Sequence, residues 1–181
     1  VDIGANIGYF SLLAKKLGAG KVYAFEPERT NLYYLRKNNE INNYDIMIKD
    51  YAISNKDGVA KFYLCSYDSG HHTLNQNKGI RDYRKTSLLR KLLDRGKQDS
   101  YEVIVDKLDS VIDIGEKISI IKIDAEGSES LIWEGMDRIL RDNKDIKLIV
   151  EFFPLLLKSM GVYKKFKNPI FFNMGGAILA R

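Results

Sequence analysis

The sequence opens with Val1-Asp-Ile-Gly-Ala-Asn-Ile-Gly-Tyr-Phe10, and Ala24-Phe-Glu-Pro-Glu28 follows after a short interval. In the first stretch, an apolar strand end runs into a turn that contains Gly4 and Gly8, and a helix is predicted to follow. The second stretch is a short apolar strand that ends on Glu26. Because parallel strands place their carboxyl ends at one edge of an α/β sheet, the two stretches predict a doubly wound, Rossmann-like sheet with a nucleoside-binding crevice.

The residues around this crevice have complementary chemistry. Gly4 and Gly8 let backbone amides approach a ligand at the start of a helix, where unpaired N–H groups favour a carboxylate or a phosphate. Glu26 can accept hydrogen bonds from both hydroxyls of a ribose. The pattern therefore indicates a ligand that combines a nucleoside with a second polar group.

The glycine spacing selects among such ligands. A dinucleotide fingerprint requires G-x-G-x-x-G, but Asn6 and Tyr9 occupy the second and third glycine positions. Asp2 precedes the first glycine by two residues, and an acid there would repel a pyrophosphate but suits an ammonium group. S-adenosylmethionine, with an amino-acid head and an adenosine tail, therefore fits better than NAD. A nicotinamide-dependent oxidoreductase is the alternative that Asn6 and Tyr9 disfavour.

Four segments resemble the FkbM-type S-adenosylmethionine-dependent methyltransferases, in the same order and with similar gaps. They are the opening stretch, Phe25-Glu-Pro27, Leu108-Asp109-Ser110 and Ile121-Lys-Ile-Asp-Ala-Glu-Gly-Ser-Glu129. The resemblance extends from Val1 to about Pro154. It implies a class I methyltransferase that methylates a hydroxyl of a sugar, glycolipid or secondary metabolite. It also implies that Asp124 and Glu126 lie near the methyl group and the acceptor, and that the cofactor is held by Asp2, Gly4, Asn6, Gly8, Glu26 and Asp50.

The adenine end of the cofactor is expected at the end of a third strand, predicted over residues 45–53. There, Asp50 can accept a hydrogen bond from the exocyclic amine, and Ala52, two residues on, is also expected at the adenine edge. Tyr51 can either stack on the base or pack into the core, and the sequence leaves both roles open.

The reaction requires a group that removes a proton from the acceptor, because a hydroxyl is hardly ionised at neutral pH. His72 is the first candidate, since histidine titrates near neutrality, and Asp124 is the second. The histidine pair His71-His72 together with Asp124 and Glu126 offers a metal site as an alternative, but no tight ligand spacing supports it, so no metal is predicted. A non-catalytic adenosyl-binding or oligomerisation module is a further reading.

The remaining pattern alternates strands and helices, as in a mostly parallel sheet with one antiparallel edge strand. Helical spacing places Ile7, Phe10, Leu13 and Leu17 on one face of the first helix, and Thr30 is the predicted N-cap of the second. Ser128 is expected to cap one helix that continues to Leu140. The other predicted elements are strands over 59–64, 101–105, 118–123 and 145–153, a short helix over 107–112, and a closing hairpin over 169–172 and 177–180.

The chain is long enough for one domain, predicted over residues 1–181, because it has 181 residues of which 45% are hydrophobic. Residues 66–100 lack regular signals and are predicted to form an insertion or lid. Between Lys78 and Lys97, eight basic residues and two acids give this segment +6, whereas the whole chain carries +5. The charge is therefore local. As a hypothesis, it recognises an anionic small-molecule or glycan acceptor; the segment is otherwise a solvated helix face.

Composition limits the other partners. The basic segment has few aromatics, so nucleic acid is not expected. No apolar run approaches the roughly 20 residues of a transmembrane helix, although peripheral membrane contact stays open. The single cysteine, Cys65, suits a reducing compartment, and a cytoplasmic location is expected. Only three residues precede Gly4, so the sequence is expected to begin inside its first strand.

Overall fold

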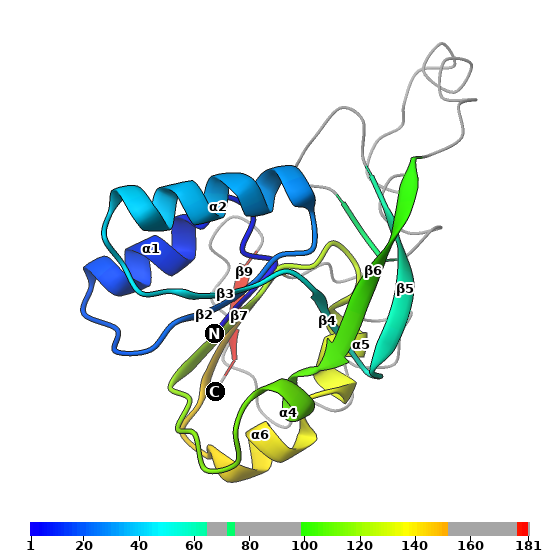
Figure 1. The fold of residues 1–181 in the computed structure, drawn as a ribbon. Coiled ribbons are helices and arrows are strands. Elements are labelled where there is room, and N and C mark those ends of the chain that lie inside the picture. The colour runs from blue at the N-terminus through cyan, green and yellow to red at the C-terminus, as the bar shows by residue number, and fades with distance from the viewer. Residues whose placement is uncertain (65–71, 75–98, 152–176, 181) are drawn as a thin grey trace.

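The computed structural model describes residues 1–64, 72–74, 99–151 and 177–180. A central sheet has the strand order β3-β2-β1-β7-β8-β9, and a smaller sheet has the order β4-β6-β5 (Figure 1). The central strands are β1 (Asp2–Ile3), β2 (Tyr23–Phe25), β3 (Met47–Lys49), β7 (Ile120–Ile123), β8 (Lys147–Glu151) and β9 (Ala177–Ala180). All of these pairings are parallel except that of β8 with β9. The predicted Rossmann-like sheet with one antiparallel edge strand is therefore confirmed.

Helices cover both faces of the central sheet. Helices α1 (Tyr9–Lys16) and α2 (Arg29–Ile41) lie on one side, where Ala24 packs with Leu35 (Figure 1). The other side is covered by α4 (Leu108–Val111), α5 (Glu129–Glu134) and α6 (Asp137–Asp142), and there Phe25 packs with Ile132. Ala24 and Phe25 point to opposite faces because successive side chains alternate along a strand. The sheet is thus held at its centre by two separate apolar layers.

The outer surface of α1 differs from the expectation for a helix that is buried on its apolar side. Phe10 is 47% exposed and Leu17 is 78% exposed, whereas Ser11 is the buried residue of this helix. Ser11 faces inward because its hydroxyl donates a hydrogen bond to Asp2 beneath the helix, at 2.7 Å. The inward face of α1 therefore combines a polar contact with β1 and the packing of Leu12 and Ala14 on the core.

The predicted third strand over residues 45–53 is wrong as a single element. Strand β3 ends at Lys49, and β4 (Ala52–Ser54) begins a second sheet with β6 (Ser100–Lys107), to which β5 (Gly58–Tyr63) pairs antiparallel. The chain changes sheets at Asp50 and Tyr51, because Asp50 is exposed beside Arg36 while Tyr51 packs against Phe25. The strand is therefore interrupted by one side chain that faces solvent, Asp50, and one that packs into the core, Tyr51.

One predicted helix cap is wrong, and one predicted helix is divided in two. Helix α2 is capped by Glu28, whose Oε2 accepts from the amide of Asn31 at 2.7 Å, so Thr30 lies inside the helix. Ser128 is the N-cap residue of α5, as predicted, but its side chain makes no capping hydrogen bond. The predicted single helix to Leu140 is divided into α5 and α6. The division falls at Gly135, where a Cβ would lie 2.0 Å from the carbonyl oxygen of Ser54. The helix is therefore interrupted where its backbone lies close to β4.

Several predictions fall outside the described residues. They concern Cys65, most of the insertion over 66–100 with its basic segment 78–97, and the first arm of the closing hairpin over 169–172. In the part of the chain that is described, no helix combines the length and the apolar character needed to cross a bilayer.

Candidate functional site

The loop after β1 is anchored between two neighbouring strands. The amides of Gly4 and Ala5 both donate to the carbonyl oxygen of Phe25, each at 3.0 Å. Gly4 has φ +73, and a Cβ there would lie 1.8 Å from the carbonyl oxygen of Asp124. Only glycine can therefore bring this loop so close to the end of β7.

Glu26 is held at the end of β2 by backbone amides from two directions. Its Oε2 accepts from the amide of Asn6 at 2.7 Å, and its Oε1 accepts from the amide of Glu28 at 2.9 Å. Asn6 adopts φ +51, which aims its amide at the carboxylate. Glu26 is 5% exposed, and this burial raises the pKa of its carboxyl to about 7, against the lowering effect of the two amides. The side chain of Asn31 also hydrogen-bonds this carboxylate, which keeps only part of its accepting capacity for a ligand hydroxyl.

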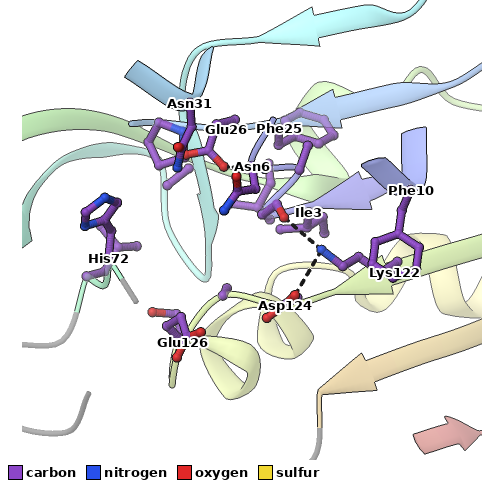
Figure 2. A pocket seen from close by; sticks show the side chains of 18 of the residues that line it. Ile3, Asn6, Phe10, Phe25, Glu26, Asn31, His72, Lys122, Asp124 and Glu126 are labelled. Carbon is purple, nitrogen blue, oxygen red and sulfur yellow. Dashed lines mark hydrogen bonds and ion pairs between the residues drawn. The ribbon is translucent and has the colours of Figure 1, made fainter. Parts of the chain in front are cut away.

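A second polar group lies at the ends of β1 and β7. Nζ of Lys122 donates to the carbonyl oxygen of Gly4 at 2.8 Å, and it lies 3.4 Å from Oδ1 of Asp2 and 3.3 Å from Oδ2 of Asp124. Figure 2 shows Lys122 pointing toward Asp124, next to the ring of Phe10, whose centroid is 5.3 Å from Nζ. We call Asp2, Lys122 and Asp124 the acid–lysine cluster.

Lys122 was missed by the sequence analysis, which treated residues 118–123 as an apolar strand. It is the one charged residue in the stretch Ile118-Ser-Ile-Ile-Lys-Ile123. A lysine inside a buried strand is costly unless it is paired, so it normally marks a nearby acid. That signal was present: one acidic partner, Asp124, lies two residues further on, and the other, Asp2, lies on the neighbouring strand β1.

The turn after β7 is organised by Glu129. Its Oε1 accepts from the amides of Ala125 and Gly127, each at 3.1 Å, and burial raises the pKa of this carboxyl. Within the turn, Glu126 adopts φ +48, and its carbonyl oxygen accepts from the hydroxyl of Thr73 at 2.8 Å. The turn is therefore tied to the segment that carries His72.

These elements surround a cavity of about 380 Å³. This volume is within the usual range for small-molecule sites. His72 lies on the opposite side of the cavity from Lys122 (Figure 2), with its ring centroid 6.0 Å from that of Phe62. Polar groups from the loop after β1, the end of β2 and the end of β7 thus meet an apolar wall in one cavity. The apolar wall includes Phe10, Phe25, Ala52, Ile53, Phe62 and Leu74.

The predicted site residues divide into two groups. Those that line the cavity are Gly4, Asn6, Glu26, Ala52, His72, Asp124 and Glu126. The others, which are Asp2, Gly8, Asp50 and Tyr51, are not part of its wall. Asp2 is buried behind the wall, Gly8 is the N-cap of α1, Asp50 pairs with Arg36 at 3.5 Å, and Tyr51 packs on Phe25. Their assignment to the cofactor stays a prediction.

The structure also locates the Leu108-Asp109-Ser110 motif and bears on the alternative of a metal site. Asp109 of the Leu108-Asp109-Ser110 motif accepts from the amides of Arg138 and Ile139, at 2.8 and 3.0 Å, so this motif caps α6 and lies away from the cavity wall. Across the described ranges, no three or more His, Cys, Asp or Glu side chains come together as a group able to hold a metal ion.

The fold and the site together define a Rossmann-like domain with a cavity at the ends of β1, β2 and β7. The chain belongs to the methyltransferase FkbM domain family, whose profile matches residues 2–160. A crystal structure of methyltransferase FkbM from Methylobacillus flagellatus KT superposes with a TM-score of 0.54 and 18% sequence identity, over 91% of this chain and 35% of that chain. At this identity the likeness concerns the fold. The chain spans about a third of that protein's length. No curated protein matches the sequence.

Proposed function

We propose that this chain is an S-adenosylmethionine-dependent methyltransferase that acts on a hydroxyl of a sugar, glycolipid or secondary metabolite. The observation that carries the proposal is the placement of Glu26, whose two oxygens are each held by one backbone amide at the wall of the cavity. Membership of the FkbM family supports the reaction class. The hydroxyl acceptor is inferred from the resemblance in sequence.

The donor set of the cavity fits the proposed cofactor. Glu26 would hold the ribose diol, and the apolar surface of Ala52, Ile53 and Phe25 would cover the adenine. The acid–lysine cluster would hold the amino-acid end, because Lys122 and Asp124 line the same cavity with opposite charges. When bound, S-adenosylmethionine supplies an electrophilic methyl group on its sulfonium.

Within this proposal, His72 is the group that takes the acceptor's proton. Oδ2 of Asp124 lies 3.3 Å from Nζ of Lys122, so the proposal assigns Asp124 to this ion pair and the acceptor's proton to the imidazole of His72. Glu126 lines the cavity as well, and its turn is hydrogen-bonded through Thr73 to the segment of His72. Glu126 is therefore assigned to orienting the acceptor hydroxyl.

Cofactor choice is tested first, by calorimetry on the full-length protein. S-adenosylhomocysteine is expected to bind more tightly than NADH, and Glu26→Ala is expected to weaken it by roughly 10- to 100-fold, since two hydroxyl–carboxylate hydrogen bonds are lost. Ile114→Ala is the control, because Ile114 is 88% exposed and lies outside the cavity wall. Tighter binding of NADH would favour an oxidoreductase instead.

Turnover is tested next, by transfer of a labelled methyl group to sugars, glycolipids and polyketide alcohols. His72→Asn is expected to lower kcat by roughly 100-fold or more while cofactor affinity is kept. His71→Asn is the matched substitution, and the pH dependence of kcat is expected to follow His72. Cofactor binding without turnover on any acceptor would indicate a non-catalytic adenosyl-binding module.

Two further features of the proposal concern the acceptor and the compartment. The basic segment 78–97 supports an acceptor that carries negative charge. Reversing the charges of Arg90 and Lys91 should then raise KM for the acceptor without changing cofactor affinity, and unchanged acceptor kinetics would remove this feature. The single cysteine supports action in the cytoplasm.

A further inference from the structure

Lys122 is a buried cation in the wall of the cavity. The residue is 9% exposed, and its ammonium lies between Asp2, Asp124 and the carbonyl oxygen of Gly4. A buried ammonium requires such partners, because an unpaired charge in this position would destabilise the fold. The lysine is therefore fixed at the end of β7, where it can act on a ligand.

Asp2 forms an ion pair with Lys122 on the side away from the cavity. Its Oδ2 accepts from the hydroxyl of Ser11 at 2.7 Å, and among the described residues its buried Oδ1 has no hydrogen-bond donor, with Nζ of Lys122 at 3.4 Å as its ion-pair partner. Asp2 is not part of the cavity wall. An acid in this position cannot face a ligand ammonium directly, and its charge is directed at Lys122 instead.

The cavity therefore presents charges of both signs at this corner. Lys122 and Asp124 both line it, and 38% of the Asp124 side chain is exposed. A ligand with only a cationic group would pair with Asp124 and leave Lys122 without an anionic group of the ligand, and a ligand with only an anionic group would leave Asp124 without a cationic one. A zwitterion with adjacent ammonium and carboxylate groups satisfies both residues.

We propose that Lys122 binds the α-carboxylate of the cofactor's amino-acid end while Asp124 receives its ammonium, an inference that rests on the proposed function. Asp2 is then a positioning residue that holds Lys122 through the end of β1. The opening D-x-G pattern thus acts on the amino acid through a lysine of another strand.

The test compares two ligands that differ only in this carboxylate, S-adenosylmethionine and decarboxylated S-adenosylmethionine. Their dissociation constants are measured by calorimetry with full-length wild type, Lys122→Met and Lys61→Met. Lys61 is the control because it is an exposed lysine on a strand, β5, outside the cavity wall. Wild type and Lys61→Met should favour the carboxylated ligand by roughly 10- to 100-fold, and Lys122→Met should reduce that ratio to roughly threefold or less.

A purely structural role would give a different result. In that case Lys122→Met would weaken both ligands by the same factor and keep their ratio, which would overturn the inference. If Lys122→Met does not fold, Lys122→Arg should retain the preference for the carboxylated ligand, and a loss of the preference in a folded arginine variant counts against it. Equal affinity of wild type for the two ligands would overturn the inference alone. Failure of wild type to bind either ligand would overturn the proposed function with it.

Discussion

The amide of Asn6 donates a 2.7 Å hydrogen bond to Oε2 of Glu26 across 20 positions of sequence. This bond joins the loop after β1 to the end of β2 and fixes the orientation of a buried carboxylate. Because Oε1 accepts from the amide of Glu28, neither oxygen can rotate away without losing a partner. A ligand therefore meets a carboxylate that is already oriented, at a low cost in conformational entropy.

The pH dependence of ligand binding should follow Glu26. Burial raises its pKa to about 7, and only the ionised form accepts hydrogen bonds from both ribose hydroxyls. The affinity for S-adenosylhomocysteine should therefore rise as the pH increases from about 6 to about 8, and binding near pH 6 should release protons. Calorimetry in buffers of different ionisation enthalpy measures both effects. Glu26→Gln should bind more weakly and show a flat profile, and an equally steep profile in that variant would contradict the assignment.

The stability of the ligand-free protein should also depend on Glu26, but it should fall as the pH rises, whereas the affinity rises. The pKa of Glu26 rises from 4.5 to about 7 on folding, so the folded protein retains the proton more strongly than the unfolded chain. Stability should therefore fall as the pH rises from about 4.5 to about 7, by up to about 3 kcal/mol, and change little above that. Thermal unfolding of wild type and Glu26→Gln across this range isolates the contribution. A Tm difference between the two proteins that does not vary with pH would contradict it.

Gly4→Ala should destabilise the fold severely. A Cβ at Gly4 would lie 1.8 Å from the carbonyl oxygen of Asp124, and the residue has φ +73, so β1 and β7 would have to separate. We expect a loss of more than about 3 kcal/mol and no ligand binding. Gly115→Ala is the matched control, because Gly115 also has a positive φ, +86, but no atom lies within 4 Å of its added Cβ. It should cost about 1 kcal/mol. Similar denaturation midpoints for the two variants would show that the contact with Asp124 is unimportant.

Glu129 should stabilise the turn after β7 without needing its charge. Its Oε1 accepts from the amides of Ala125 and Gly127, and a glutamine oxygen can accept both. Glu129→Ala should therefore lower the free energy of unfolding by about 2 to 3 kcal/mol, whereas Glu129→Gln should change it by less than about 1 kcal/mol. Urea denaturation distinguishes these outcomes. Equal losses in both variants would mean that the carboxylate charge is required.

Asp109 should affect folding and leave ligand affinity unchanged. It accepts from the amides of Arg138 and Ile139 at the start of α6, so Asp109→Ala should cost about 1 to 2 kcal/mol, as expected for a lost helix cap. Ser110→Ala is the control, since Ser110 makes one exposed hydrogen bond to Asp57 at 3.2 Å. Tm and the dissociation constant for S-adenosylhomocysteine are measured together. Weakened binding by folded Asp109→Ala would connect this motif to the site.

The sequence by itself determined the fold class and one side of the site. The interval between Gly4 and Glu26 predicts two adjacent parallel strands, because local spacing controls a strand–turn–helix–strand unit. The prediction of Asn6, Glu26 and Asp124 at one edge of the sheet follows from the same rule, that parallel strands end together. Boundaries were less predictable. The break after Lys49 depends on the contact of Tyr51 with Phe25, and the break at Gly135 depends on the approach of β4.

Only the tertiary structure decided which charges meet at the cavity. Asp2 and Lys122 are far apart in sequence, and they pair because β1 and β7 are neighbours in the sheet. From sequence alone, Asp2 was assigned to a ligand and Lys122 was overlooked, since the partner of a buried charge is chosen by strand order, which local patterns do not encode. The position of Glu26 thus follows from spacing along the sequence, whereas the pairing of Asp2 with Lys122 follows from contact between strands that are distant in sequence.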